Sequence, residues 1–130
     1  MKTIESNIQQ SCVTWFRYQY QQFSKLLFAV PNGGFRNQAT AGRLKAEGVV
    51  AGVADLILLF PNHGFHALCI EMKTDVGRQS ELQRQWQADV EKFNYKYIIC
   101  RNFDEQVVLF CFKLRINTLE DVPFYLSFRS

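Results

Sequence analysis

The sequence lacks any apolar stretch long enough to cross a membrane. A membrane-spanning helix needs about 20 consecutive apolar residues, whereas polar or charged side chains interrupt every apolar run of this chain well before that length. The first residues, MKTIESN, also lack the apolar block that marks a secretory signal. We therefore expect a cytoplasmic protein without a membrane partner.

Paired cysteine motifs are also missing. Four scattered cysteines form no C-x-x-C pair: Cys12, Cys69, Cys100 and Cys111. We expect them to be reduced thiols, as is usual in the cytoplasm. A zinc site from His63, His66 and Cys69 is disfavoured, because His63 lies in a turn sequence and the other two would point to opposite faces of one strand.

The composition is that of one folded domain. The chain has 130 residues, of which 48% are hydrophobic and 15% aromatic, so it can bury a substantial core. It contains no linker, internal repeat or low-complexity block. We expect a single domain over residues 1–130, with the aromatic tail 119–130 packed on the core or placed in a dimer contact.

Positive charge is concentrated in the first part of the chain. The net charge is +3, and residues 1–50 alone carry six basic and two acidic side chains. This asymmetry is expected if the basic part holds phosphates. An ordinary solvated surface would also account for it.

Hydrophobic periodicity predicts an α/β fold. Helices are expected over residues 3–27, 36–47 (as a helix or ordered loop), 81–93 and from 102 or 104 to 115. Strands are expected over residues 26–30, 53–60, 65–73 and 97–100. This order predicts a mixed central sheet flanked by helices.

Charged side chains stand at the ends of two of these strands. Glu71 and Lys73 share one face of their strand, roughly 7 Å apart, and Asp55 opens the preceding apolar run. A three-residue turn ending at Gly64 would pair residues whose numbers total 126 and would set Asp55 opposite Glu71. A four-residue turn would place Asp55 on the wrong face unless a bulge corrected it. We expect the three-residue turn, because it alone brings the two acids together without a further device.

Two acids and a lysine on adjoining strands suit a metal-dependent phosphodiesterase. Mg²⁺ takes oxygen ligands and only one or two carboxylates, which Asp55 and Glu71 could supply together with the backbone carbonyl of Met72. Lys73 could orient the attacking water and stabilise the developing charge. The alternative is a structural salt bridge between Glu71 and Lys73.

Residues 31–101 resemble the VRR-NUC domain, a branch of the PD-(D/E)XK nuclease superfamily. Four blocks in the family's order carry the resemblance: PNGG-x-R from residue 31, LKAEGV-x-AGV-x-DL from residue 44, IEMKT from residue 70 and GR-x-S-x-x-Q-x-x-W from residue 77. The chain departs from the commoner pattern at Ala54, where many relatives have proline, and at Asn94, where glycine is usual.

The resemblance implies a restriction-endonuclease-like fold with an α-β-β-β-α-β core and a Mg²⁺- or Mn²⁺-dependent nuclease without an organic cofactor. Asp55 and Glu71 match the family's metal-binding acids, Lys73 its catalytic lysine, and Gln83 a glutamine that helps order the site. Glu5 matches a helical acid that supports metal binding. A first-turn glutamate serving the helix dipole is the alternative for Glu5.

The resemblance further implies DNA as the substrate. Small stand-alone members resemble Holliday-junction resolvases and act as homodimers, which predicts an endonuclease for branched DNA such as four-way junctions. A DNA-binding module of the same fold with little activity is the alternative. Five basic residues border the expected site and are candidates for phosphate contacts: Arg36, Arg43, Lys45, Arg78 and Arg84.

Overall fold

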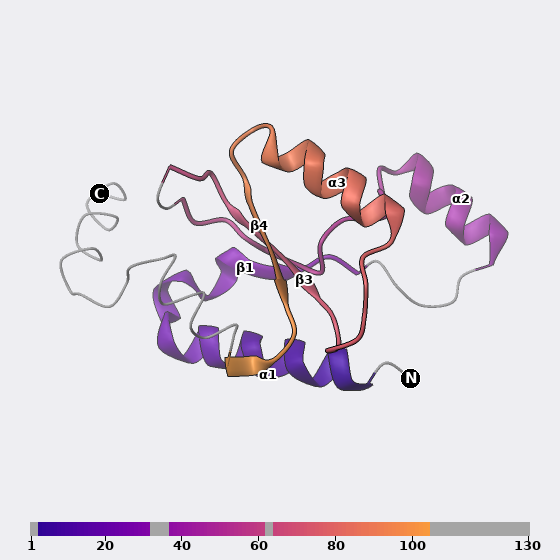
Figure 1. The fold of residues 1–130 in the computed structure, drawn as a ribbon. Helices are drawn as coiled ribbons and strands as arrows, with labels where there is room; N and C mark the ends of the chain where they lie inside the picture. Colours follow the sequence, from indigo (N-terminus) through magenta and orange to yellow (C-terminus); the bar gives the residue numbers. More distant parts are fainter. Residues whose placement is uncertain (1–2, 32–36, 62–63, 105–130) are drawn as a thin grey trace.

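A four-stranded sheet forms the centre of the protein, with helices on both of its faces (Figure 1). The computed structural model describes residues 3–31, 37–61 and 64–104. Its elements are, in chain order, α1 (Thr3–Gln19), the 3-10 helix η1 (Gln21–Leu26), β1 (Leu27–Ala29), α2 (Gln38–Ala46), β2 (Leu56–Leu58), β3 (Leu68–Met72), α3 (Glu81–Glu91) and β4 (Lys96–Cys100).

The sheet is mixed, as the sequence predicted. Its strand order is β1-β2-β3-β4, with the first three strands antiparallel and β4 parallel to β3. A parallel pair needs a crossover connection, and α3 provides it between β3 and β4. Apart from the inserted α2, the element order is the α-β-β-β-α-β core that was expected.

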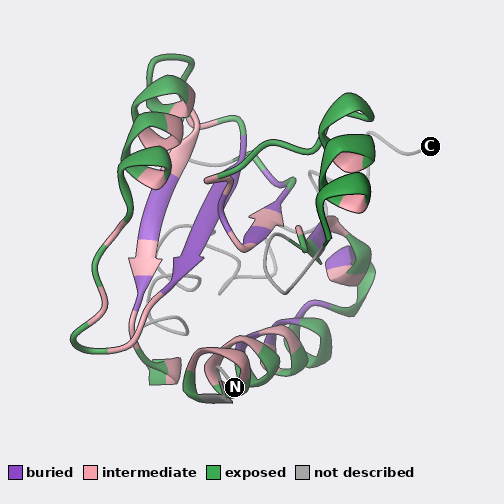
Figure 2. Ribbon diagram, turned by 90° about the vertical axis from the view of Figure 1, so that its right-hand side faces the viewer, coloured by how far each residue is buried: buried purple, intermediate pink, exposed green. Residues whose placement is uncertain are grey.

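Each face of the sheet buries a separate apolar cluster. On one face Phe16 of α1 and Phe23 of η1 pack with Leu56, Ile70 and other strand residues. On the other face a smaller cluster of buried residues packs against partly buried side chains of α3: Ala54, Cys69 and Tyr97 with Trp86 and Val90. Figure 2 shows that burial is concentrated on the strands, while the outer sides of the helices are exposed.

The register between β2 and β3 confirms the predicted pairing. Leu56 pairs with Ile70 and Leu58 with Leu68, so the residue numbers of each pair total 126. Continuing this register places Asp55 opposite Glu71, and the Met72 amide donates a 2.7 Å hydrogen bond to Asp55 Oδ2. Residues 62–63 of the connecting turn lie outside the described part of the chain.

The first helix is shorter than predicted. The α-helix ends at Gln19 rather than continuing to residue 27, and the chain goes on as η1. Tyr20 interrupts the helix with φ −123° and ψ 66°. Its buried ring packs against Trp15 and Phe16, so aromatic packing decides a turn that periodicity alone did not reveal.

The strands are also shorter than the apolar runs that predicted them. β2 covers three residues of the expected 53–60, and β3 covers five residues of the expected 65–73. Backbone hydrogen bonds continue past the regular ladder, from Val30 N to Asp55 O and from Leu59 N to Leu26 O. Gly52, with φ +88°, turns the chain before it reaches β2.

α2 is a helix rather than an ordered loop, and its ends are stabilised locally. The Asn37 side chain accepts from the Thr40 amide at its start. At its end the backbone amides of Gly48 and Val49 donate hydrogen bonds to the carbonyls of Lys45 and Leu44, respectively. This helix ending favours glycine, because φ is +107° at Gly48. No residue of α2 is buried.

The remaining helix and strand were predicted to within two residues. α3 ends at Glu91 instead of residue 93, and β4 begins one residue before the expected start. Asn94, which stands where relatives usually have glycine, has φ +64°, a conformation that asparagine tolerates better than most residues. Asparagine at this position can therefore adopt the backbone turn between α3 and β4.

Some predictions lie outside the described residues. They concern the last helix to residue 115, Cys111 and the tail 119–130. The three described cysteines, at positions 12, 69 and 100, are buried and form no disulfide with one another. Within residues 3–31, 37–61 and 64–104, no helix combines the length and apolar character needed to cross a bilayer.

Candidate active site

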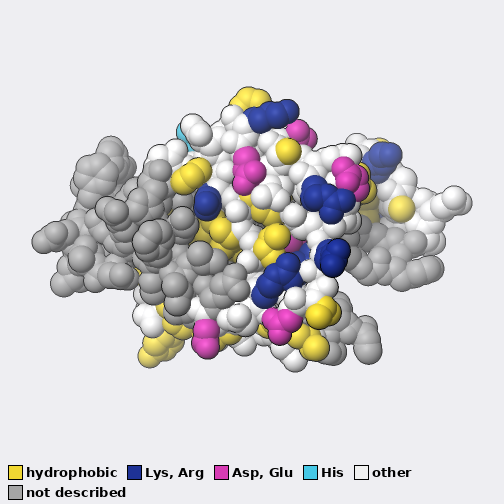
Figure 3. Space-filling model, viewed as in Figure 1, with side chains coloured by type: hydrophobic (Ala, Val, Ile, Leu, Met, Phe, Trp, Pro, Cys, Tyr) yellow, Lys and Arg dark blue, Asp and Glu magenta, His cyan; other side chains and the backbone are white. Residues whose placement is uncertain are grey.

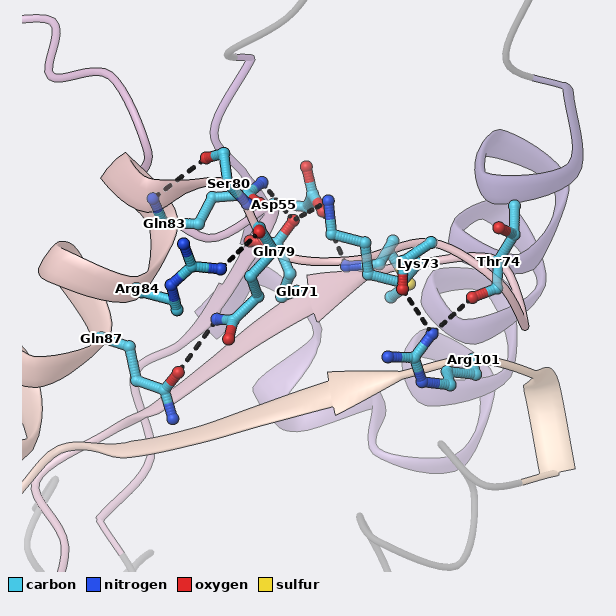
Figure 4. A network of polar contacts seen from close by, with 12 residues as sticks. Asp55, Glu71, Lys73, Thr74, Gln79, Ser80, Gln83, Arg84, Gln87 and Arg101 are labelled. Carbon is cyan, nitrogen blue, oxygen red and sulfur yellow. Dashed lines mark hydrogen bonds and ion pairs between the residues drawn. The ribbon is translucent and has the colours of Figure 1, made fainter.

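Two carboxylates meet where β2 begins and β3 ends. Asp55 precedes β2, and Glu71 lies within β3 with only 1% of its surface exposed. Both line a cavity of about 260 Å³, together with Lys73, Gln83 and Glu5. The structure thus brings together all the predicted catalytic side chains and both predicted metal-binding acids (Figure 4).

The environment of Glu71 disfavours its negative charge. Burial raises the pKa of Glu71 to about 7, and the nearby charge of Asp55 acts in the same direction. The hydrogen bond from Tyr97 and the charge of Lys73 oppose this shift. Two carboxylates in a pocket of this kind repel each other, and a divalent cation between them would relieve that repulsion.

Gln83 connects the start of α3 to the Glu71 carboxylate. Its side-chain Oε1 accepts from the Ser80 backbone amide at 2.8 Å, and its backbone amide donates to the Ser80 hydroxyl at 3.2 Å. This capping box fixes the first turn of the helix. Nε2 of the same side chain donates to Glu71 Oε2 at 2.8 Å, so the cap also orients the glutamine toward the site.

Lys73 extends along the same face as Glu71. Its Nζ lies 3.8 Å from Glu71 Oε2, and 14% of its side chain is exposed. The following loop covers it closely, because a Cβ placed on Gly77 would come within 3.4 Å of Lys73 Cδ. The amine is therefore held beside the carboxylate.

Arg101 holds that loop in place, and the sequence analysis did not identify it. Its Nη1 donates to the carbonyls of Thr74 at 2.6 Å, Gly77 at 2.9 Å and Asp75 at 3.4 Å (Figure 4). The only feature of the local sequence that could have indicated this role is the position of the arginine, directly after an apolar strand. Such a residue is more often a solvated surface charge, so its role depends on the parallel pairing of β4 with β3.

Tyr97 is a second residue that the sequence did not reveal. It lies in β4 and is 5% exposed, and its hydroxyl donates to Glu71 Oε1 at 3.0 Å. Burial, followed by the charge of Glu71, raises the pKa of Tyr97, so the phenol keeps its proton. In the sequence this tyrosine reads only as one more apolar residue of a buried strand.

Glu5 enters the site from α1. It lines the 260 Å³ cavity with Asp55 and also a neighbouring cavity of about 160 Å³ that Met72 and Gln9 border. Glu5 therefore lies close to Asp55, and its support of a metal ion stays a prediction. Gln9 was not among the predicted site residues. It borders the same cavity because it lies one helical turn further along the same face of α1.

The residues present fit a magnesium-type ion. Across the described ranges no three His, Cys, Asp or Glu side chains form a metal cluster of their own. Mg²⁺ does not require one, since it binds through one or two carboxylates and keeps several waters. Asp55 and Glu71 could provide that donor set, and Met72 borders the adjoining cavity together with Asp55 and Glu5.

The predicted phosphate-binding residues differ in how they are held. Arg43 forms a 3.0 Å ion pair with Glu47, and Arg84 forms one of 2.7 Å with Glu81. Lys45 on α2 and Arg78 in the loop after β3 are exposed and have no ion pair among the described residues. Arg36 lies outside the described part. Figure 3 shows several basic side chains gathered on one face, between α3 and α1.

The sequence matches the profile of the VRR-NUC domain over residues 2–104. The chain belongs to the VRR-NUC family. This is a nuclease-type family, and DNA is the substrate it implies. The matched region includes every residue of the cavity between β2, β3 and α3.

A solved structure named "VRR_NUC domain protein" has the same fold as this VRR-NUC chain. The two superimpose with a TM-score of 0.75, covering 87% of this chain and 89% of the other, at 20% sequence identity. At that identity the likeness shows the fold alone. No curated protein matches the sequence.

Proposed function

We propose that this VRR-NUC protein is a Mg²⁺- or Mn²⁺-dependent endonuclease that hydrolyses DNA phosphodiester bonds in the cytoplasm. One observation carries the proposal. A carboxylate that is 1% exposed shares a cavity with a second acid and lies 3.8 Å from a lysine amine. Buried charge of this kind is costly for a purely structural salt bridge but is common where chemistry is done.

Each side chain has a distinct part in this proposal. Asp55 and Glu71 would hold the ion with the Met72 carbonyl, and Glu5 would support it from α1. When bound, a divalent cation screens the phosphate charge and lowers the pKa of a coordinated water. Lys73 would orient the attacking water and stabilise negative charge as it develops. Gln83 would keep the Glu71 carboxylate in position.

The DNA would be held through its backbone. Arg43, Lys45, Arg78 and Arg84, with Arg36, would contact phosphates on either side of the cut, which orients the substrate without reading its sequence. We further propose that the preferred substrate is branched DNA such as a four-way junction, cut by a homodimer. Two sites related by a two-fold axis can cut paired strands symmetrically.

Two substitutions test the catalytic assignment. Asp55→Asn and Lys73→Ala should each lower Mg²⁺-dependent cleavage by at least about a hundredfold, the usual effect of removing one group that stabilises the transition state. Lys92→Ala, at an exposed position near the end of α3, serves as the control and should cut normally. Wild-type cleavage by either site variant, in a protein of unchanged melting temperature, would contradict the assignment.

A substrate panel tests the preference for branched DNA. Four-way junction, flap, nicked and linear duplex DNA are incubated separately with the protein and Mg²⁺. The junction should be cut fastest, and light scattering should give twice the mass of one chain. Equal cutting of linear duplex and junction would remove the resolvase function, whereas tight binding of DNA without cleavage would favour a DNA-binding module.

A further inference from the structure

The Glu71 carboxylate receives a hydrogen bond at each of its oxygens. Gln83 Nε2 donates to Oε2 at 2.8 Å, and the Tyr97 hydroxyl donates to Oε1 at 3.0 Å. These donors come from different elements, α3 and β4, on either side of the carboxylate. The side chain of Glu71 is therefore fixed from two directions before any ligand is present.

A glutamine behind Tyr97 sets the direction of its hydrogen bond. Nε2 of Gln79 donates to the Tyr97 hydroxyl oxygen at 3.3 Å and to Gln87 Oε1 at 2.9 Å. Because the hydroxyl oxygen already accepts from Gln79, its own hydrogen is directed to Glu71. The result is a chain of polar contacts that runs from Gln87 through Gln79 and Tyr97 to Glu71. Figure 4 shows its first contact, between Gln87 and Gln79.

The ring of Tyr97 is held as firmly as its hydroxyl. It belongs to the apolar cluster under α3, and its centroid lies 6.1 Å from that of Trp86. Its backbone is paired with Cys69 in the parallel ladder beside Glu71. Neither the ring nor the strand can move without disturbing the core, so the hydroxyl is an anchored donor.

We infer that Tyr97, aligned by Gln79, is a positioning residue that sets the orientation in which Glu71 binds the divalent cation. This inference rests on the proposed function, because it takes Glu71 to be a metal ligand. Each carboxylate oxygen has two lone pairs. A hydrogen-bond donor that occupies one of them fixes the orientation of the carboxylate, so the remaining lone pairs point in a fixed direction. Such partners of metal ligands orient the ligand and raise metal affinity.

A purely structural role must be separated from this one. Buried tyrosines usually find a hydrogen-bond partner, and in that case the contact would stabilise the fold without affecting the metal. Tyr97→Phe keeps the ring and removes only the hydroxyl. Tyr95→Phe is the matched control, because Tyr95 packs in the same cluster and its hydroxyl has no hydrogen-bond partner within residues 3–31, 37–61 and 64–104.

Metal binding is the decisive measurement. Isothermal titration of the whole chain with MnCl₂ should give a Kd about tenfold higher for Tyr97→Phe than for the wild type, as expected on loss of a ligand's orienting partner. Tyr95→Phe should stay within twofold. Glu71→Gln should bind at least as weakly as Tyr97→Phe. A Kd for Tyr97→Phe within twofold of the wild type would overturn the inference, whatever happens to the melting temperature.

Gln79→Leu provides a second variant if Tyr97→Phe is poorly folded. It leaves Tyr97 in place and removes only the donor that aligns its hydroxyl, so the Mn²⁺ Kd should rise about threefold. Combined with Tyr97→Phe it should add nothing further, since both changes act through one hydrogen bond. Fully additive effects would show that Gln79 does not act through Tyr97. A wild type that binds no Mn²⁺ would instead defeat the proposed function itself.

Discussion

The candidate active site differs from the α2 arm in how its charged side chains are buried and held. We define the α2 arm as residues 37–51. In the site, Glu71 is 1% exposed and is held by donors from α3 and β4. In the arm no residue is buried, and Arg43 pairs with Glu47 of its own helix. One region is organised by tertiary contacts and the other by local ones.

This difference fits the tasks proposed for the two regions. A group that holds a metal ion must be fixed to within a fraction of an ångström, and fixed positions need contacts from several elements. A cation that contacts phosphate gains its energy over a longer range and needs little more than a suitable place on the surface. The arm can therefore remain exposed while the site cannot.

The largest effect is expected where the two regions meet. An added Cβ on Gly52 would lie 2.6 Å from the Leu82 carbonyl oxygen, and Gly52 has φ +88°. Gly52→Ala should therefore lower the free energy of unfolding by about 2–4 kcal/mol through steric clash and backbone strain. Urea unfolding measures this loss.

Gly48→Ala is the matched control for Gly52. Gly48 also has a positive φ, +107°, but an added Cβ would meet nothing within 4 Å. Gly48→Ala should therefore lower the free energy of unfolding by only about 1 kcal/mol, from the backbone conformation alone. Equal losses for the two variants would show that the backbone at Gly52 does not approach α3 closely in solution.

Arg101→Met tests how far the site depends on its surrounding loop. Methionine keeps the apolar stem but loses the donors to three carbonyls of the loop that covers Lys73. Cleavage should fall about tenfold to a hundredfold because the amine is no longer held in place. Initial rates at saturating Mg²⁺ provide the measurement.

The control for Arg101 is Arg17→Met. Arg17 also donates to backbone carbonyls, those of Ser24 and Leu27, but at the end of η1. It should lower the melting temperature without slowing cleavage measured well below that temperature. If both variants lost activity in proportion to stability, Arg101 would have only a structural role.

Glu71→Gln should make the metal-free protein more stable at alkaline pH. The pKa of Glu71 is raised from 4.5 to about 7 on folding, mainly by burial, so the folded state binds this proton more tightly than the unfolded state. The stability that this tighter proton binding contributes is fully present below pH 4.5 and is lost as the pH rises through 7. In EDTA at pH 8 the variant should gain about 1–2 kcal/mol.

Unfolding in urea at pH 5 and at pH 8 checks the sign of this effect. The gain should shrink toward pH 5, where the wild-type carboxyl is protonated in the folded state. Added Mn²⁺ should reverse the order at pH 8, because it stabilises only the form that binds it. A variant less stable than the wild type at pH 8 in EDTA would contradict the unfavourable burial of charge.

The smallest effect is expected from the arm. Lys45→Ala should leave the unfolding free energy within about 0.5 kcal/mol and reduce the salt dependence of DNA binding by about one phosphate contact. Arg43→Ala should change binding less, because Arg43 already pairs with Glu47. Fluorescence anisotropy over a salt series, in an Asp55→Asn background that does not cut, measures both. A large loss of stability for Lys45→Ala would mean that the arm is not exposed.

Local sequence signals were sufficient for part of the site. The short turn before β3 predicted the register that sets Asp55 opposite Glu71, because a three-residue turn pairs residues whose numbers total 126 and so places both acids on one face. Ser80 stands directly before the predicted helix 81–93 and is of a residue type that commonly caps helices, and the capping box is present. Gln83 was found only through the family resemblance, since a glutamine in a first helical turn otherwise looks like surface.

Other parts could not be predicted. Tyr97 reaches Glu71 across 26 residues of sequence, and Arg101 reaches Thr74 across 27. These separations span the α3 crossover, and no local pattern records which side chains a parallel strand will bring together. The interruption of α1 at Tyr20 was missed for a related reason, because ring packing overrode helical periodicity.

The sequence by itself determined the mixed sheet, the pairing of β2 with β3 and the two acids with their lysine, because each follows from alternation, turn length and apolar runs. The tertiary structure alone decided how deeply Glu71 is buried and which donors hold it. Those properties arise when the α3 crossover places β4 beside β3, and the free energy of an ionised group depends on all the neighbours that replace its water.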